Sequence, residues 1–441
     1  MNQRGFDNQP AEYLTAAAAA KMLGVKRATV YAYASRGWLG LATKGPGSRA
    51  LYPRSAVERL RLRARARSGH TAVAAGALWW GEPVLDTAVS SMTPQGPEYR
   101  GRNAVELARQ GMTFEGCAEW LWASKSLSPW PPALKAPRWV RLPAPGPGAT
   151  LSRLLTLVSA VALFDDTRFG ASGEAELHRA RGLIRLMAQR AGPWAERASA
   201  EYGSISATLG VSLRGSVLSR EELGAVDMAL VLCADHELNA STFAARIAAS
   251  AGCDLYASVC AGLATLSGAR HGGACDRVEA MLSRVETPRA LVRASRASSR
   301  LAVETTERSG FGSGAGSPRG RGASGPGPDP VERPGFEPVS YPGGDPRGPP
   351  LVEVALKVAK VRSRMKAVEA MVKTVARLTG ESPSVDFGLV AVARALGFGP
   401  GSAGAMFAVA RMAGWVAHVL EQRQSGAAIR PRARYAAENR D

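Results

Sequence analysis

Apolar residues recur at the three- and four-residue spacing of an amphipathic helix over most of this chain, from about residue 75 to 308 and again from 351 to 441. The alternation of apolar and polar residues that is typical of strands is scarce there. Residues 309–350 are instead rich in Gly and Pro, and residues 1 to about 68 are rich in Ala and Arg. The pattern predicts a mainly α protein with a small N-terminal domain.

The composition limits the partners that the chain can have. Its 441 residues carry a formal net charge of +19, which favours anionic partners, either nucleic acid or phosphorylated small molecules. The five cysteines form no CxxC pair, so neither a zinc site nor a disulfide framework is indicated. No apolar run approaches the ~20 residues of a membrane-spanning helix, and residues 1–15 lack the apolar region of a signal peptide. We therefore expect a soluble cytoplasmic protein.

The first 68 residues contain the pattern of a helix-turn-helix. In LTAAAAAKMLGVKRATVYAYASRG, Thr15 is placed to cap one helix, Gly24 to end it, and a second helix follows. Two short apolar segments then flank KGPGSR, as the strands of a wing do. The unit resembles the winged helix-turn-helix of MerR-type regulators, whose second helix enters the major groove of DNA. This resemblance implies DNA contacts from Lys26, Arg27, Thr29, Tyr31 and Arg36, with Lys44 and Arg49 on the wing.

An Ala-rich helical pair with a basic face can also keep this fold without binding DNA. Both interpretations of the N-terminal domain stay open.

Polar residues interrupt the apolar helices of the C-terminal body at two places. In LCADHELNASTFAARIAAS, His236, Glu237 and Asn239 precede a helix of small residues. Buried polar groups need partners, so these residues either satisfy one another or line a ligand cavity. In LSGARHGGACDRVEAML, His271 precedes two glycines and a helix. The glycines let a substrate approach the imidazole, and the helix N-terminus predicts backbone amides that face an anion.

A third polar group lies inside MFAVARMAGWVAHVLEQ, which is apolar on nearly every face of a helix. An unpaired buried guanidinium is costly, and this helix supplies Arg411 with no nearby carboxylate. A bound carboxylate ligand would satisfy it. His418, two turns later, is interpreted as a hydrogen-bonded packing residue.

These segments, together with GFEPVSYPGGDPR, SVDFGLVAVARALG and IRPRARY, occur in an order that resembles the citrate synthase family over roughly residues 75 to 436. The resemblance implies an all-helical homodimer that closes over oxaloacetate and acetyl-CoA and condenses them to citrate and CoA, with no metal or redox cofactor. It predicts a large domain from residues 75–275 and 386–441. The small domain would span residues 276–385, with a Gly/Pro-rich insertion at about 309–340.

The resemblance also implies roles for single residues. His236 would bind oxaloacetate, His271 would stabilise the enol of the acetyl thioester, and Asp386 would take the methyl proton. From the sequence alone, Asp386 could equally be a helix N-cap. The carboxylates of oxaloacetate would be held by Arg347, Arg411 and Arg430. Arg430 is expected to reach across the dimer.

These residue types suit the reaction. An α-thioester proton is weakly acidic, so a base and a donor to the enol oxygen must act together. Bidentate Arg–carboxylate pairs orient the ketone and neutralise its charge.

One position departs from the family pattern. Family members commonly carry PGFGHPLYPxGDPR, whose His donates to the oxaloacetate carbonyl, whereas this chain has Glu337 and Pro338 where Gly and His belong. Proline has no N–H to donate. Ser313 in SGFGSGAG offers a second candidate for the His position, but no GDPR follows it.

Three hypotheses follow from this departure. The chain is an active citrate synthase with an unusual proton donor, a substrate-sensing pseudoenzyme that controls DNA through its N-terminal domain, or a product altered by a local reading-frame slip within residues 310–340. The slip is suggested by the sudden loss of helical periodicity there, which a solvated surface loop would also explain.

Overall fold

The structure is a computed structural model that describes residues 13–35, 43–44, 50–53, 57, 85–124, 129–137, 139–170, 173–198, 203–269, 271–284, 334–336, 341 and 343–431. The predictions for Arg36, Arg49, Ser313, Glu337 and Pro338 lie outside the described residues. The chain divides into two compact units, Met1–Asp86 and Thr87–Asp441.

The N-terminal unit consists of β1 (Tyr13–Thr15), α1 (Ala16–Leu23), α2 (Arg27–Ser35), β2 (Thr43–Lys44) and β3 (Ala50–Pro53). The Thr15 hydroxyl accepts the N–H of Ala18, and Gly24 adopts a φ of 65°, so the predicted start and end of the first helix are confirmed. Strands β2 and β3 pair antiparallel as the strands of a wing do, and β1, which was not predicted, pairs with the other edge of β3.

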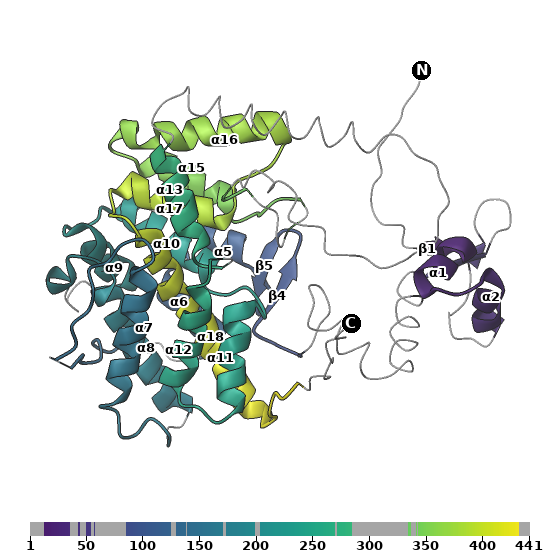
Figure 1. Cartoon of the computed structure of the whole chain (residues 1–441), viewed down its shortest axis with the longest axis horizontal. Coiled ribbons are helices and arrows are strands. Elements are labelled where there is room, and N and C mark those ends of the chain that lie inside the picture. The colour runs from purple at the N-terminus through teal and green to yellow at the C-terminus, as the bar shows by residue number, and fades with distance from the viewer. Residues whose placement is uncertain are drawn as a thin grey trace, which may run out of the picture. The chain divides into compact units, whose positions relative to one another are not determined.

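The body is a packed group of helices with a small antiparallel sheet beside α5 (Figure 1). The sheet has the order β4 (Ser90–Thr93), β5 (Gly96–Tyr99), β6 (Arg102–Asn103). The first helices are α5 (Ala104–Arg109), α6 (Phe114–Leu121), α7 (Thr150–Ala162), α8 (Gly173–Arg190), α9 (Ile205–Arg214) and α10 (Arg220–Cys233), with a short 3-10 helix, η2 (Ala195–Arg197). The later helices are α11 (Ala240–Ser250), α12 (Leu255–Leu266), α13 (Ala274–Arg284), α15 (Gly348–Val358), η4 (Arg362–Met365), α16 (Lys366–Thr379), α17 (Val385–Leu396) and α18 (Ser402–Ser425). The predicted mainly α body is confirmed.

Helix α18 runs through the middle of the body and contacts α6, α7, α8, α10, α11, α12, α13 and α17 (Figure 1). By length and a mean hydropathy of 1.4, it is apolar enough to cross a membrane, which the sequence analysis did not expect. However, 94% of that stretch is buried inside the protein, so packing against other helices accounts for its apolar faces.

Three other features bring the predicted site residues towards α18. They are the turn between α10 and α11, the turn between α12 and α13, and the first turn of α17. Helix α13 packs against both α17 and α18, and α15 packs along α17.

Candidate active site

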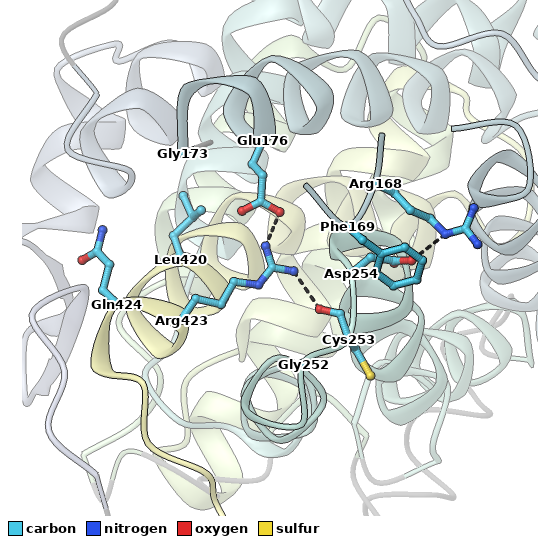
Figure 2. A pocket seen from close by; sticks show the side chains of 10 residues that line it. All are labelled: Arg168, Phe169, Gly173, Glu176, Gly252, Cys253, Asp254, Leu420, Arg423 and Gln424. Atoms are coloured by element: carbon cyan, nitrogen blue, oxygen red, sulfur yellow. Dashed lines mark hydrogen bonds and ion pairs between the residues drawn. The ribbon is translucent and has the colours of Figure 1, made fainter. Parts of the chain in front are cut away.

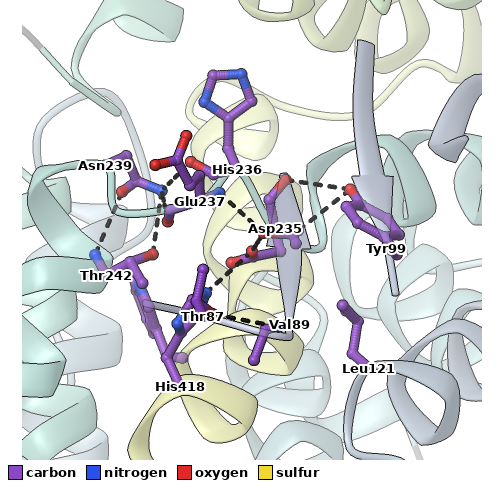
Figure 3. A network of polar contacts seen from close by, with 12 residues as sticks. Thr87, Val89, Tyr99, Leu121, Asp235, His236, Glu237, Asn239, Thr242 and His418 are labelled. Carbon is purple, nitrogen blue, oxygen red and sulfur yellow. Dashed lines mark hydrogen bonds and ion pairs between the residues drawn. The ribbon is translucent and has the colours of Figure 1, made fainter. Parts of the chain in front are cut away.

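The turn between α10 and α11 carries His236. Asn239 caps α11, because its Oδ1 accepts the N–H groups of Ser241 (3.1 Å) and Thr242 (3.3 Å). Glu237 has a φ of 52°, in the left-handed region that non-glycine residues seldom adopt. The turn directs the His236 ring away from Asp235 (Figure 3).

A buried network holds this turn from the opposite side (Figure 3). Asp235 is fully buried; its Oδ2 accepts the Ser90 hydroxyl and lies 3.1 Å from His418 Nε2. The Ser90 hydroxyl in turn accepts the N–H of Glu237 at 3.1 Å. Burial raises the pKa of Asp235, but His418 and Arg411 outweigh it, so this pKa lies below its usual value. The interpretation of His418 as a hydrogen-bonded packing residue is confirmed.

The turn between α12 and α13 carries His271 and two glycines. The N–H of Gly272 donates to Leu266 O at 2.8 Å, and that of Gly273 donates to Gly268 O at 3.2 Å. These amides are therefore used within the turn, and the predicted anion-binding corner of free amides is wrong. A Cβ on Gly272 would lie 2.7 Å from Leu266 O, so glycine is needed because the chain folds back on itself.

The imidazole of His271 is held by the start of α11. Its Nε2 lies 2.8 Å from Ser241 Oγ and 3.2 Å from Asn239 Oδ1, and its ring meets Phe407 of α18 edge-on at 6.0 Å. Burial and the charge of Arg411 lower the pKa of His271 to about 4, so the ring is neutral at pH 7. The Ser241 hydroxyl donates to Asn239 Oδ1 at 2.7 Å; when it turns to donate to Nε2 of His271 instead, Nδ1 carries a proton that can be donated.

Asp386 lies in the first turn of α17. The N-cap of that helix is Ser384, whose Oγ accepts the N–H of Phe387 at 3.5 Å, so the alternative that Asp386 is the N-cap is wrong. Cys275 Sγ donates to Asp386 Oδ1 at 3.3 Å. Burial raises the pKa of Asp386 despite the opposing effects of Cys275 and Arg347. A desolvated carboxylate is a stronger base than an exposed one.

Two of the predicted oxaloacetate arginines are buried. Arg347 is 5% exposed, and its Nε and Nη2 each lie 2.9 Å from a carboxylate oxygen of Asp345. Arg411 is 1% exposed, and its Nε donates to Cys233 O at 2.8 Å. Within the part of the chain that the structure describes, Arg411 Nη1 is buried without a hydrogen-bond partner. A buried guanidinium with an open N–H favours an anionic oxygen as its partner.

The charges of both arginines act on His236. Burial first, and then Arg347, Arg411 and His271, hold the pKa of His236 well below its usual value, so its ring is neutral at pH 7. Its Nε2 lies 3.0 Å from the hydroxyl of Tyr341. The sequence analysis did not assign Tyr341 a role, although its place six residues before Arg347 in the family motif was a signal.

Arg430 lies elsewhere within this subunit. It is exposed beyond the end of α18, and the neighbouring Ile429 N–H donates to Ser250 Oγ at 3.1 Å. Ser250 is the last residue of the 11-residue helix that Asn239 caps, so Ser250 lies roughly 15 Å from Asn239.

The predicted DNA-binding residues lie at the start of α2. Lys26 and Arg27 are exposed, and Tyr31 is 49% exposed, while the intervening Val30 is buried in the core of the unit. Thr29 is half-buried, and its N–H donates to Lys26 O at 2.9 Å. The basic side chains therefore lie on the outer face of the helix.

A hollow of about 390 Å³ opens near the ends of α8 and α18 (Figure 2). In it, Arg168 pairs with Asp254 at 3.0 Å, and Arg423 pairs with Glu176 and donates to Cys253 O. The charges compensate one another, and none of the predicted catalytic or oxaloacetate-binding residues lines this hollow. The residues with candidate catalytic groups are those around His236 and His271.

Each of the two parts of the chain matches a known protein family. A family model described as "Citrate synthase, C-terminal domain" matches residues 77–432, and one described as "Helix-turn-helix domain" matches residues 13–65. Citrate synthase 2 of Bacillus subtilis is 30% identical over 300 residues, which cover 65% of this chain and 72% of that protein. The citrate synthase of Haloferax volcanii is 31% identical over 306 residues, with the same shares.

Solved structures show the same fold. The citrate synthase of Thermoplasma acidophilum, in a ternary complex with carboxymethyl coenzyme A and oxaloacetate, has a TM-score of 0.63 at 20% identity over 81% of this chain and 95% of that one. The citrate synthase of Thermotoga maritima has a TM-score of 0.59 at 19% identity, with the same coverage. The predicted fold is confirmed, and since the family match covers most of the sequence, the chain belongs to the citrate synthase family and carries a helix-turn-helix domain in front of it.

Proposed function

We propose that this chain condenses acetyl-CoA with oxaloacetate to give citrate and CoA. The observation that carries the proposal is the meeting of a neutral histidine pair, a buried carboxylate and two buried arginines from distant parts of the sequence. The charge of Arg347 helps to lower the pKa of both His236 and Asp386, and the charge of Arg411 helps to lower the pKa of both His236 and His271. The oxaloacetate bound by the related Thermoplasma acidophilum protein supports the choice of substrate.

His271 and Asp386 form what we term the enol half-site. Asp386 would remove a methyl proton from acetyl-CoA, which its raised pKa favours. His271 would donate a hydrogen bond to the thioester oxygen as the enol forms. A neutral imidazole suits this role because, held by Ser241, it can present an N–H to the developing charge without first losing a proton.

His236, Arg347 and Arg411 form the ketone half-site. The arginines would hold the carboxylates of oxaloacetate, and the buried Nη1 of Arg411, which has no partner among the described residues, supports this role. Because Pro338 cannot donate a proton to the ketone, we expect a reduced rate; losing one acid–base group typically costs ~10²–10⁴-fold. The reaction as proposed requires no metal or redox cofactor.

We also propose that the protein works as a cytoplasmic homodimer. Large apolar side chains are exposed just after α7, with Leu163 and Phe164 each 62% exposed and Phe169 72% exposed, as at a subunit interface. A second subunit would supply Arg430 to the ketone half-site. Light scattering of a Phe164→Asp variant tests this: a dimer that stays intact would argue against this surface as the interface.

The deciding experiment measures CoA release from acetyl-CoA with and without oxaloacetate. We expect release that depends on oxaloacetate, together with an oxaloacetate-induced rise in melting temperature, because a ligand that binds only the folded state stabilises it. Simple hydrolysis would release CoA equally in both reactions. A melting temperature unchanged at saturating oxaloacetate would contradict both the enzyme and the sensor proposals.

The second candidate is a ligand-sensing pseudoenzyme that regulates DNA. The exposed Lys26, just before α2, and Arg27 and Tyr31 on α2 favour it, together with Pro338 in the body. If those cations meet phosphates, duplex affinity should fall steeply with salt, and a chain that starts near Thr71 should lose DNA but keep oxaloacetate binding. If the shortened chain binds DNA with the same affinity, the binding comes from the overall positive charge of the protein and not from the N-terminal domain.

A further inference from the structure

The ketone half-site needs a proton donor that Pro338 cannot be. When the enol carbon attacks the ketone of oxaloacetate, the carbonyl oxygen becomes an alkoxide, and a donor within hydrogen-bond reach must neutralise it. The donor must therefore lie beside His236 and between the arginines that hold the substrate. Among the described residues, Tyr341 lies beside both His236 and Arg347.

The position of Tyr341 follows from several contacts. Its hydroxyl lies 3.0 Å from His236 Nε2, and the two rings meet edge-on with centroids 5.6 Å apart. The guanidinium of Arg347 lies 5.6 Å from the centre of the phenol ring. The hydroxyl also donates to Met92 Sδ at 3.6 Å. A thioether is a weak acceptor, so the hydroxyl can exchange this contact for a stronger one at little cost.

We propose that Tyr341 is the proton donor to the ketone oxygen of oxaloacetate in this chain. The inference rests on the proposed condensation, and it gives Tyr341 a catalytic role that replaces the histidine missing at Pro338. The side chain is 4% exposed, so its O–H faces the interior next to His236 rather than bulk water.

The step balances with water as the only further reactant. The C=C π pair of the acetyl-CoA enolate forms the bond to the ketone carbon as its own oxygen becomes the thioester carbonyl again, and the π electron pair of the ketone moves onto the ketone oxygen. Tyr341 transfers its hydroxyl proton to that oxygen, which gives the tertiary alcohol of the product. Water then hydrolyses the product thioester to citrate and CoA. Before the next turnover, protonated Asp386 returns the methyl proton to water and the phenolate of Tyr341 takes one proton back from water, directly or through His236, so the protein gains and loses no net proton.

The chemistry of the phenol fits this task. Burial raises the pKa of Tyr341 to about 12, while Arg347 and Arg411 act in the opposite direction, so the hydroxyl stays protonated near neutral pH. An alkoxide is a stronger base than a phenolate, so the transfer is downhill. The two arginines then stabilise the transient phenolate.

The test removes only the hydroxyl. In the full chain, Tyr341→Phe should lower citrate formation by at least about 100-fold. Exchange of acetyl-CoA methyl protons with deuterated water, measured with a non-condensing oxaloacetate analogue, should change less than about threefold. Tyr256→Phe is the matched control, because it removes a buried hydroxyl that bonds Asp165 outside both half-sites, and it should alter neither signal.

A rescue experiment separates chemistry from structure. If Tyr341 is the donor, restoring a histidine with Glu337→Gly and Pro338→His should make the Tyr341→Phe change nearly silent, with a loss below about threefold. A loss that persists in the repaired chain would show that Tyr341 acts only by holding His236, and it would overturn the proposal.

Two other outcomes are also decisive. Full citrate formation by Tyr341→Phe would overturn the donor role while leaving the condensation proposal intact. No citrate from the unmodified chain would overturn both.

Discussion

The two half-sites differ in how their histidines are held. In the enol half-site, Ser241 and Asn239 at the start of α11 bind Nε2 of His271, and Asn239 is itself fixed as a helix cap. In the ketone half-site, His236 Nε2 contacts the hydroxyl of Tyr341, which lies three residues after the altered Pro338 in the sequence. Under the proposed function, the enol chemistry therefore depends on residues at helix ends, whereas the ketone chemistry depends on a segment whose sequence departs from the family motif at Glu337 and Pro338.

The two histidines are nevertheless kept in the same protonation state. Burial is the largest cause of the lowered pKa for both, and Arg411 contributes to each. The segment around Tyr341 can thus change its proton donor while Arg411 of α18 still helps to lower the pKa of both histidines. If the chain catalyses the proposed condensation, proton abstraction keeps the residues of the family motif, whereas proton delivery to the ketone has lost its histidine.

The strongest test of this comparison removes the base. Asp386→Asn should lower both proton exchange and citrate formation by about 10³-fold, because no enol can form without it. The oxaloacetate-induced melting shift should remain, since Asp386 belongs to the enol half-site. The rates come from deuterium exchange followed by mass spectrometry and from CoA release. Exchange that survives within about tenfold would show that another group is the base.

The next test acts on the residue that both half-sites share. Arg411→Leu should weaken oxaloacetate binding by about 100-fold, because a buried charge-assisted hydrogen bond to a carboxylate is lost. It should also let the pKa of His271 rise from about 4 towards its ordinary value, since Arg411 helps to lower it. Melting curves with oxaloacetate and an NMR titration of the histidines measure the two effects. An unchanged melting shift would show that Arg411 does not hold the ligand.

A smaller effect is expected from repairing the ketone half-site. The double change Glu337→Gly with Pro338→His should raise citrate formation by at least about tenfold, roughly 1.4 kcal/mol of transition-state stabilisation. Exchange of the methyl protons should stay constant, because the enol half-site is untouched. If exchange rises in parallel with condensation, the repair acts on substrate binding rather than on proton delivery.

Local signals allowed much of this molecule to be predicted. Thr15 and Gly24 bound the first helix as expected because caps depend on neighbouring backbone groups. The apolar helix around Arg411 indicated a buried charge, and the structure leaves one of its N–H groups open within the described residues. Such inferences succeed when a residue and its requirement lie within a turn or two of the chain.

The sequence-based predictions were wrong or incomplete where the contacting residues are far apart in the sequence, or where a backbone N–H can bond more than one acceptor. Sequence could not show that the amides of Gly272 and Gly273 are used by their own turn, because this depends on how the chain closes. Nor could it show that His418 meets Asp235, which lies 183 residues earlier. The contact of Tyr341 with His236 spans 105 residues, so only the fold brought these two side chains together.

The smallest expected effect tests whether a raised carboxylate pKa marks function in this fold. Asp227 on α10 has its pKa raised to about 6 by burial and, to a smaller extent, by the nearby Glu115. It accepts the N–H of Phe114 at 3.1 Å and the Ser206 hydroxyl at 3.2 Å, so it joins helices rather than facing either half-site. If burial alone explains its pKa, Asp227→Asn should leave exchange and citrate formation unchanged.

The sign of its effect on stability follows from linkage. The folded state holds the proton of Asp227 up to about pH 6, whereas the unfolded chain releases it near 3.8, so this group makes stability fall as pH rises between those values. Asparagine cannot ionise, so the free energy of unfolding of the variant should rise relative to that of the parent by about 1 kcal/mol as the pH goes from 4 to 6. The expected rise is kept small because Asp227 is only half-buried. Urea unfolding of both proteins across this range measures the difference. A parallel pH dependence in the two proteins would place the titration elsewhere, and a loss of exchange in the variant would mean that the enol half-site extends to α10.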